Sequence, residues 1–198
     1  MEDRVQDALP DNLTVEEFLD WADTRRAARG DAGLSDEPKW ELFDGTPWMQ
    51  DHVLWVHARA KLAACVELAA AIRRAKLSLG LSDDGLGVRV SAKGSYQPDG
   101  VVFPLNLIAD EDRFAPEPVI VIEVLSPSTR KKDLGEKVTG YGRVPSIAHY
   151  LAIDPVPGHV LHFRRGPKGL IRPKAPVAGP TLHLDPPGLD IRIGKLFG

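Results

Sequence analysis

The alternation of hydrophobic and polar positions predicts helices in the first third of the chain and mostly strands after it. Residues 1–12 are polar, and we expect this N-terminus to be disordered. Thr14 has the character of a helix N-cap, which predicts a first helix ending near Arg26. Loop composition over residues 27–38 then predicts a connection without regular structure.

A hairpin and a long helix are predicted next. The hairpin spans residues 40–49, with Asp44–Gly45 as its turn dipeptide. The helix is alanine-rich and runs from residue 52 or 57 to residue 76. Its core-facing positions are predicted to be Leu62, Cys65, Val66, Ala69 and Ile72, and its polar positions to be Arg59, Glu67 and Arg74.

From residue 77 the pattern changes to short hydrophobic runs that are typical of strands. The most hydrophobic run, residues 118–125, predicts a strand that is buried on both faces. One further helix is predicted over residues 132–143. The other predicted strands are 77–81, 88–91, one opening at Asp99, 148–154, 159–165, and segments around 170–172, 181–184 and 189–193. Residues 13–198 are therefore expected to form a single α/β domain, with a mixed central sheet flanked by helices and a β-rich C-terminal part.

Composition narrows the class of protein. The 198 residues are 43% hydrophobic and 27% charged, which is ordinary for one globular domain. The net charge of −3 means that a nucleic-acid partner would need a local basic patch. The single cysteine, Cys65, and the absence of a signal-peptide pattern predict a cytoplasmic protein. No hydrophobic run approaches the roughly 20 residues that span a bilayer, so no membrane contact is expected.

Two carboxylates are the leading candidates for chemistry. Glu123 lies within the strand expected to be buried on both sides, where an ionised carboxylate is costly unless it is paired, protonated or bound to a metal. Asp99 opens an earlier strand, 24 positions before (123 − 99). If these strands pair, the two carboxylates converge, and such hard oxygen ligands suit Mg²⁺ or Mn²⁺. The alternatives are a buried salt bridge or an end-of-strand position near solvent at Glu123, and a simple turn at Asp99.

Several segments resemble the successive motifs of the Uma-two family of restriction-endonuclease-like proteins, within the PD-(D/E)XK nuclease superfamily. The most specific segment is the run Glu-Val-Leu-Ser-Pro-Ser-Thr-Arg that begins at Glu123. The other matching segments are Trp40-Glu-Leu-Phe-Asp-Gly, His57-Ala-Arg-Ala-Lys, Tyr96-Gln-Pro-Asp, Asp133-Leu-Gly-Glu-Lys and Val144-Pro-Ser-Ile-Ala-His-Tyr-Leu-Ala-Ile-Asp. This resemblance implies a restriction-endonuclease-like fold and a metal-dependent nuclease.

The resemblance also implies roles for individual residues. Asp99 and Glu123 match the two acidic elements of the superfamily motif, but its lysine is replaced here by Leu125. Lys137 is the expected substitute, because Asp133, Lys137 and Tyr141 are spaced to lie along one helix face. Lys132 and the absence of any catalytic lysine are the alternatives.

Two further residues complete the expected site. Glu41 matches an acidic element that often completes the metal site, with an exposed hairpin residue as the alternative. His57 matches the family histidine and is expected to accept a proton, contact a phosphate or cap its helix. The basic run Arg130-Lys131-Lys132 is either a phosphate contact or a solvated helix start.

The sequence therefore predicts an endonuclease that hydrolyses phosphodiester bonds in DNA, with Mg²⁺ or Mn²⁺ bound by Asp99, Glu123 and Glu41. A homodimer is expected by analogy with nucleases that cut two strands. The alternative function is a non-catalytic protein that binds nucleic acid or metal on the same fold, which the leucine at position 125 favours.

Overall fold

The structure is a computed structural model, and it describes residues 9–28, 39–49, 54–171, 173 and 175–198. Its helices are α1 (Val15–Ala28), α2 (Trp55–Ala75), α3 (Arg130–Asp133) and α4 (Glu136–Gly142), with 3₁₀ turns η2 (Leu105–Leu107) and η3 (Ile193–Lys195). Its strands are β1 (Trp40–Phe43), β2 (Thr46–Met49), β3 (Leu79–Ser82), β4 (Val88–Ser91), β5 (Gly94–Tyr96), β6 (Gly100–Pro104), β7 (Ile120–Val124), β8 (His149–Asp154), β9 (His159–Gly166), β10 (Gly169–Ile171), β11 (Thr181–Leu184) and β12 (Leu189–Arg192).

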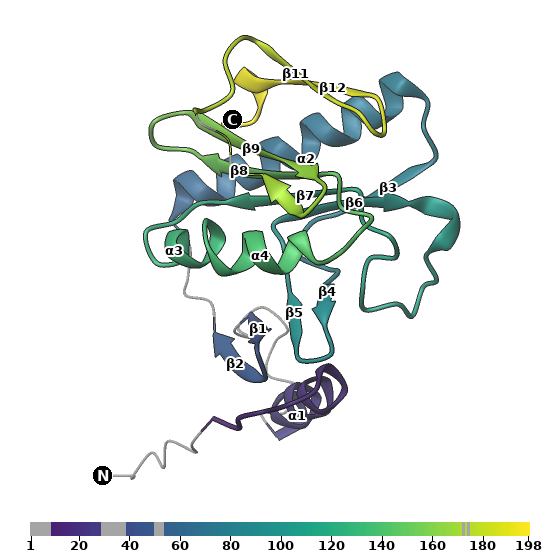
Figure 1. Cartoon of the computed structure of the whole chain (residues 1–198), viewed down its shortest axis with the longest axis vertical. Coiled ribbons are helices and arrows are strands. Elements are labelled where there is room, and N and C mark those ends of the chain that lie inside the picture. The colour runs from purple at the N-terminus through teal and green to yellow at the C-terminus, as the bar shows by residue number, and fades with distance from the viewer. Residues whose placement is uncertain (1–8, 29–38, 50–53, 172, 174) are drawn as a thin grey trace.

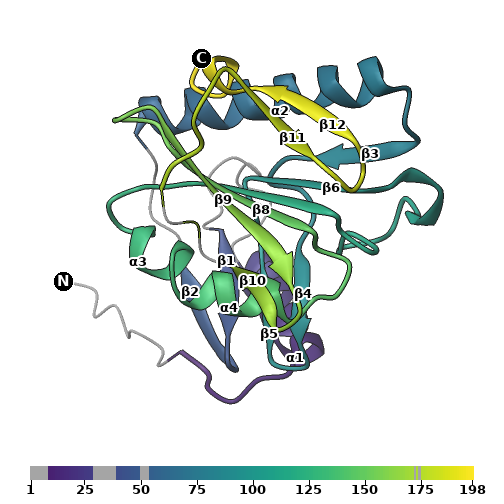
Figure 2. The ribbon, with the colours of Figure 1, turned by 45° about the horizontal axis from the view of Figure 1, so that its top comes forward.

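A six-stranded mixed sheet in the order β10-β9-β8-β7-β6-β3 forms the centre of the molecule. Only the β7–β8 pair is parallel among its described pairings. Helix α2 covers one face of this sheet, and α3 and α4 cover the other (Figures 1 and 2). The predicted α/β fold with a mixed central sheet and flanking helices is confirmed.

Side chains of the central strands alternate between two hydrophobic cores, as the two-residue period of a strand requires. Ile120, Ile122 and Val124 face the core under α2, while Val121 and Leu125 face the core under α4. The same alternation places Glu123 on the α4 face. The predicted strand buried on both sides is confirmed, since every residue of β7 is buried.

A second sheet, in the order β2-β1-β5-β4, stands beside the α4 face of the central sheet. The predicted hairpin is its β1–β2 pair, and Asp44 adopts a positive φ of 47° at the turn. Strand β5 was not expected from the sequence. It pairs with both β1 and β4 and thereby brings the hairpin next to the residues that precede β6.

Two expectations about helices are wrong in whole or in part. The helix expected over residues 132–143 is divided into α3 and α4, with Leu134 and Gly135 outside helical geometry. The predicted core face of α2 is correct only in part: Ile72 is buried as expected, but Leu62 and Val66 are exposed, by 66% and 58%, and Glu67 is buried. Glu67 is buried because the C-terminal hairpin β11–β12 packs against that face of the helix.

The C-terminal hairpin is attached to the central sheet by polar contacts as well as by hydrophobic packing. Leu184, Leu189 and Ile191 join the core under α2. His149 on β8 lies 2.7 Å from the Pro186 carbonyl through Nε2 and 2.9 Å from His162 through Nδ1. The predicted strand-rich C-terminal part therefore belongs to the same domain core.

Several expectations fall wholly or partly outside the described residues. They include most of the disordered N-terminus, most of the loop over 27–38 and a start of the long helix at residue 52; within the described part, α2 begins at Trp55. Asp11 and Asn12 are described, and they contact Thr46 and Lys93 through hydrogen bonds. None of the described helices is both long enough and hydrophobic enough to cross a bilayer.

Candidate active site

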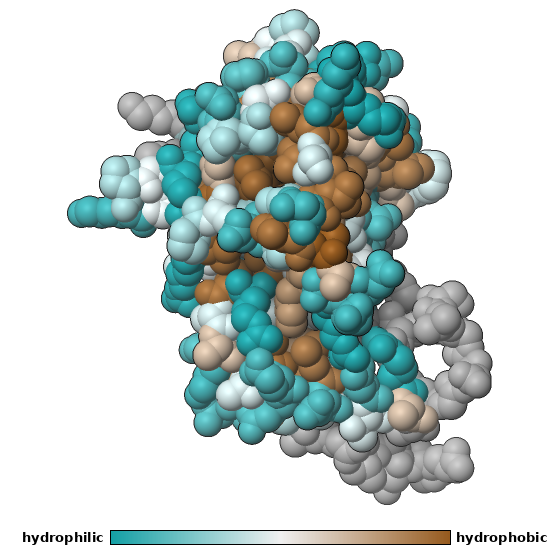
Figure 3. Space-filling model, turned by 90° about the vertical axis from the view of Figure 1, so that its right-hand side faces the viewer, coloured by the Kyte–Doolittle hydropathy of each residue, from teal (hydrophilic) through white to brown (hydrophobic). Residues whose placement is uncertain are grey.

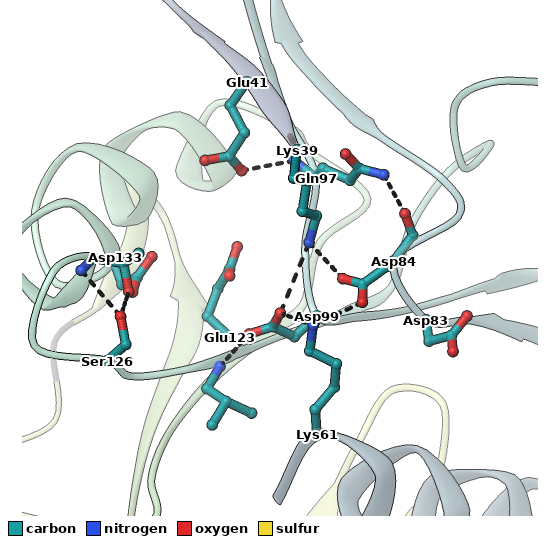
Figure 4. A network of polar contacts seen from close by, with 12 residues as sticks. Lys39, Glu41, Lys61, Asp83, Asp84, Gln97, Asp99, Glu123, Ser126 and Asp133 are labelled. Atoms are coloured by element: carbon teal, nitrogen blue, oxygen red, sulfur yellow. Dashed lines mark hydrogen bonds and ion pairs between the residues drawn. The ribbon is translucent and has the colours of Figure 1, made fainter. Parts of the chain in front are cut away.

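The register of the central sheet brings the two predicted carboxylates together. Strands β6 and β7 pair antiparallel with Gly100 opposite Ile122, so the next position along places Asp99 opposite Glu123. Asp99 Oδ2 also accepts a hydrogen bond from the Val124 amide at 2.7 Å. Figure 4 shows the Glu123 carboxylate with Asp99 on one side and Glu41 on the other. The expectation that the two strands pair is confirmed.

Helix α4 supplies the groups that bind Glu123. The Lys137 ammonium lies 2.9 Å from Glu123 Oε1, and the Tyr141 hydroxyl donates to the same oxygen at 2.6 Å. A glycine lets α4 pack closely against Tyr96 of β5, because a Cβ added to Gly140 would lie 2.3 Å from an atom of the Tyr96 ring. The helical spacing that predicted Lys137 and Tyr141 on one face therefore holds within α4, despite the break at Gly135.

Lys137 is shared among three carboxylates. Besides Glu123, its ammonium lies 3.0 Å from Glu41 Oε1 and 3.3 Å from Asp133 Oδ1. Glu41, expected either as a ligand or as an exposed residue, is 0% exposed on β1, and its Oε1 accepts a hydrogen bond from the Gln97 amide. We call Glu41, Glu123, Asp133, Lys137 and Tyr141 the inner cluster.

The inner cluster contains more acidic groups than basic ones. One ammonium faces three carboxylates, and all four side chains are at most 4% exposed. Burial raises the pKa of Glu123 well above its ordinary value, and the neighbouring carboxylates raise it further while Lys137 opposes the shift. Burial would favour the neutral amine of Lys137, but the three carboxylates outweigh it and raise its pKa. The contacts with these carboxylates therefore favour the cationic form of Lys137.

Asp99 belongs to a second, more accessible group of charges. Its Oδ1 lies 2.9 Å from the Lys61 ammonium and 3.8 Å from that of Lys39. Both lysines also pair with Asp84, Lys39 at 2.5 Å and Lys61 at 2.7 Å. We call Lys39, Lys61, Asp84 and Asp99 the outer cluster (Figure 4). Its two cations balance its two carboxylates.

Sequence reasoning missed three members of the outer cluster. Lys61 is four residues after His57 on α2, so helical spacing alone could have placed it on the same face. Cys65, four residues further on, contacts the Asp99 carbonyl at 3.6 Å, which confirms that this face points at the site. Lys39 and Asp84 carry no comparable signal, because they reach the site from a strand start and a turn.

The remaining candidates have these environments. His57 is 4% exposed, and its Nδ1 is buried without a hydrogen-bond partner among the described residues. Leu125, at the expected lysine position, is a buried member of the core under α4.

Burial and nearby carboxylates raise the pKa of Cys65 to about 11, so its thiol stays protonated and is a poor nucleophile. Ser126 contacts Thr129 at the entry to α3, which is a structural role.

The oxygen atoms present suit a hard divalent cation. The hydrogen bonds and ion pairs of the Glu123 carboxylate with the described residues use Oε1, which leaves Oε2 for another ligand, and among the same residues Asp99 Oδ1 pairs with the Lys39 and Lys61 ammonium groups. Glu41 Oε2 is buried without a hydrogen-bond partner among those residues. Within the described chain, however, no group of three or more His, Cys, Asp or Glu side chains is arranged to hold a metal ion. The donor set that fits is therefore the Asp99–Glu123 pair.

A mixed sheet with flanking helices, and two carboxylates side by side on adjacent strands beneath a lysine, define a restriction-endonuclease-like protein. The family model described as "Uma2: Putative restriction endonuclease" matches residues 15–193. The chain therefore belongs to this family, and the resemblance noted in the sequence is confirmed.

A solved structure supports the same fold. It is described as a putative nuclease belonging to DUF820 from Anabaena variabilis ATCC 29413, and it superposes on this chain with a TM-score of 0.64 at 16% sequence identity. The match covers 93% of this chain and 97% of the other, so it shows that the two folds agree over nearly their full length. No curated protein matches the chain.

Proposed function

We propose that this protein is a Mg²⁺- or Mn²⁺-dependent endonuclease that hydrolyses phosphodiester bonds in DNA. The inner cluster carries the proposal, because three buried carboxylates around one ammonium leave an excess of negative charge that a bound cation would offset. A purely structural ion pair has no need for such an excess. Membership of a restriction-endonuclease family supports the same reaction.

Asp99 Oδ1 and Glu123 Oε2 would hold the metal ion, and Glu41 remains a predicted additional ligand. Bound there, a divalent cation would polarise a phosphate and lower the pKa of a bound water. Lys137 fixes Glu123 through Oε1 and supplies a positive charge beside the reacting phosphate. Lys61 and Lys39, which pair with Asp99 and Asp84, are cations available to the phosphate backbone.

In the proposed reaction the oxygen of a water molecule forms a bond to phosphorus, and the bond from phosphorus to one ester oxygen breaks. The proton lost by the water is carried away by a base, and the departing oxygen takes up a proton. His57 is the predicted proton acceptor, since it is buried one helical turn before Lys61. Arg130, Lys131 and Lys132 remain predicted contacts to the DNA backbone.

The proposal is tested by incubating purified protein with supercoiled DNA and MgCl₂, MnCl₂ or EDTA. We expect nicking that requires the metal and that is lost in Asp99→Ala and in Glu123→Ala. Asp190→Asn is the matched control, because this carboxylate is exposed on β12 and, among the described residues, pairs only with His183. Equal cleavage by the wild type and both alanine variants would identify a contaminant and contradict the proposal.

Metal binding separates this function from the non-catalytic alternative. In calorimetric titrations of the wild type, we expect Mg²⁺ or Mn²⁺ to bind at millimolar concentration or below, and Asp99→Ala to abolish the binding. A wild type that binds neither ion but still binds DNA would favour the non-catalytic protein. In that case Lys137 would not replace, in catalysis, the lysine that the superfamily motif has where this chain has Leu125.

A homodimer is the second part of the proposal. Strand β3 is an edge of the central sheet, and the exposed Leu105 and Leu107 lie beside it. Figure 3 shows hydrophobic surface gathered on this side of the molecule. Sedimentation equilibrium would give the mass of a dimer, and Leu107→Lys would shift it to the monomer. A monomeric wild type would rule this part out.

A further inference from the structure

A cavity of about 640 Å³ opens next to the outer cluster. Helix α1, the start of β1, strand β5, the turn between β3 and β4, and residues 112–114 line it. Its volume lies in the range of pockets that take a small organic ligand, and it far exceeds what a lone phosphate would fill. The proposed function assigns no ligand to this cavity.

The cavity and the candidate active site share residues. Lys39 and Asp84 of the outer cluster line it. Gln97 also lines it, and the backbone amide of Gln97 donates a hydrogen bond to Glu41 Oε1. Figure 4 shows these three side chains beside Asp99. A ligand in the cavity would therefore be held directly beside the position proposed for the scissile phosphate.

Flat side chains form much of the cavity wall. Trp40 and Phe114 are aromatic residues of this lining. The guanidinium of Arg25 lies over the ring of Trp40 at 5.8 Å and over that of Trp21 at 5.2 Å. Aromatic rings and guanidinium planes are the surfaces on which nucleobases stack.

Charge and hydrogen bonding at the cavity also suit a nucleotide. Among the described lining residues four side chains are cationic, namely Arg25, Arg26, Lys39 and Arg113. They outnumber the three lining carboxylates by one, in a chain whose net charge is −3. The Ser95 side chain lines the cavity, and its hydroxyl makes no hydrogen bond to the described residues. It is therefore available to a base edge.

We propose that this cavity binds one unpaired nucleotide of a DNA strand, next to the phosphate that the active site cleaves. The proposal rests on the proposed nuclease function for its substrate. A cavity whose wall includes aromatic side chains accepts a base only after that base has left the helical stack, so single-stranded or locally unpaired DNA is the preferred substrate. The cations beside Asp99 then hold the adjoining backbone.

The test measures binding in EDTA, where cleavage does not interfere. Fluorescence anisotropy of labelled DNA compares a short oligothymidylate, a duplex of equal length, and the same duplex with one central unpaired thymidine. We expect the oligothymidylate to bind at least about 10-fold more tightly than the paired duplex, and the unpaired thymidine to recover most of that difference.

Substitutions at Arg25 locate the binding to the cavity. We expect Arg25→Ala to weaken binding of the oligothymidylate by about 5- to 30-fold, the range of one lost stacking contact. Arg25→Lys keeps the charge but loses the planar group, so it should weaken binding nearly as much. Arg164→Ala removes an exposed arginine of β9 outside the cavity and should leave binding within about 2-fold of the wild type.

The proposal is overturned if the paired duplex binds as tightly as the single strand, or if Arg25→Ala and Arg164→Ala weaken binding equally. Competition by free thymidine monophosphate at the same concentration as the oligothymidylate would also overturn it, since the cavity would then serve a free nucleotide. These results do not depend on cleavage. A protein that binds as expected but never cuts DNA would refute only the nuclease function.

Discussion

Two buried glutamates, at opposite sides of the central sheet, have opposite electrostatic environments. Glu67 on α2 is 2% exposed, and hydrogen bonds from Arg192 and Arg74 surround its carboxylate. Burial alone would raise the pKa of Glu67, but these contacts outweigh it and lower that pKa to about 2. Glu123 on β7 is 3% exposed, and burial together with neighbouring carboxylates raises its pKa.

The difference shows that burial of a carboxylate does not by itself indicate function. Glu67 has two guanidinium groups for one carboxylate, and its contact with Arg192 joins α2 to β12. Glu123 shares one ammonium with two other carboxylates. A buried carboxylate whose charge is fully offset by guanidinium groups joins elements of the fold, whereas a buried excess of carboxylates is maintained at a cost that a ligand can offset.

The largest expected effect comes from removing the single cation of the inner cluster. Lys137→Met leaves three buried carboxylates without a counter-charge, and we expect it to reduce the free energy of unfolding by about 3–5 kcal/mol and to abolish DNA cleavage. Urea denaturation and a nicking assay measure the two effects. Arg192→Met is the matched control at Glu67, and it should retain cleavage. Unchanged stability in Lys137→Met would contradict the charge imbalance.

Neutralising each glutamate should change stability in opposite directions. Glu67→Gln loses charge-assisted hydrogen bonds and should reduce the free energy of unfolding by about 1–3 kcal/mol, since both arginines are about half exposed. Glu123→Gln keeps the shape of the side chain and removes excess charge, so in EDTA it should be neutral or stabilising by up to about 2 kcal/mol. Equal destabilisation by both variants would remove the distinction between the two sites.

The contribution of Glu67 should depend on pH. Its pKa is lower in the folded protein, about 2, than its ordinary value of 4.5, so the unfolded chain takes up a proton first as the pH falls. The stability due to Glu67 is thus fully present above about pH 5 and is lost as the pH falls towards 2. Urea midpoints of the wild type and Glu67→Gln should converge across this interval. A constant difference would show that Glu67 acts through packing.

The smallest effect concerns the balanced charges of the outer cluster. Lys61→Gln removes an ammonium that competes with a metal ion for Asp99 Oδ1, and we expect the affinity for Mg²⁺ to rise by about 3- to 10-fold. Calorimetry measures the change without requiring activity. Lys93→Gln, far from the site on the turn between β4 and β5, is the control. A weaker affinity in Lys61→Gln would show that Lys61 supports the metal site.

Much of the inner cluster could be predicted from the sequence. A carboxylate within a hydrophobic strand marked Glu123, and the four-residue spacing of a helix put Lys137 and Tyr141 on one side. These inferences succeeded because strand alternation and helical periodicity are local properties of the chain. The resemblance to a nuclease family added Glu41 and His57, and their roles in catalysis remain predictions.

The sequence by itself determined the order of the elements, the fold class and the strand position of Glu123. Tertiary structure decided the rest. It buried Glu67 instead of Leu62 and Val66, because β12 arrives on that face of α2 from 125 residues further along the chain. It also gathered Lys39, Lys61 and Asp84 around Asp99 from three separate elements. Charge balance at a buried site depends on such long-range contacts, and hydrophobic periodicity carries no information about them.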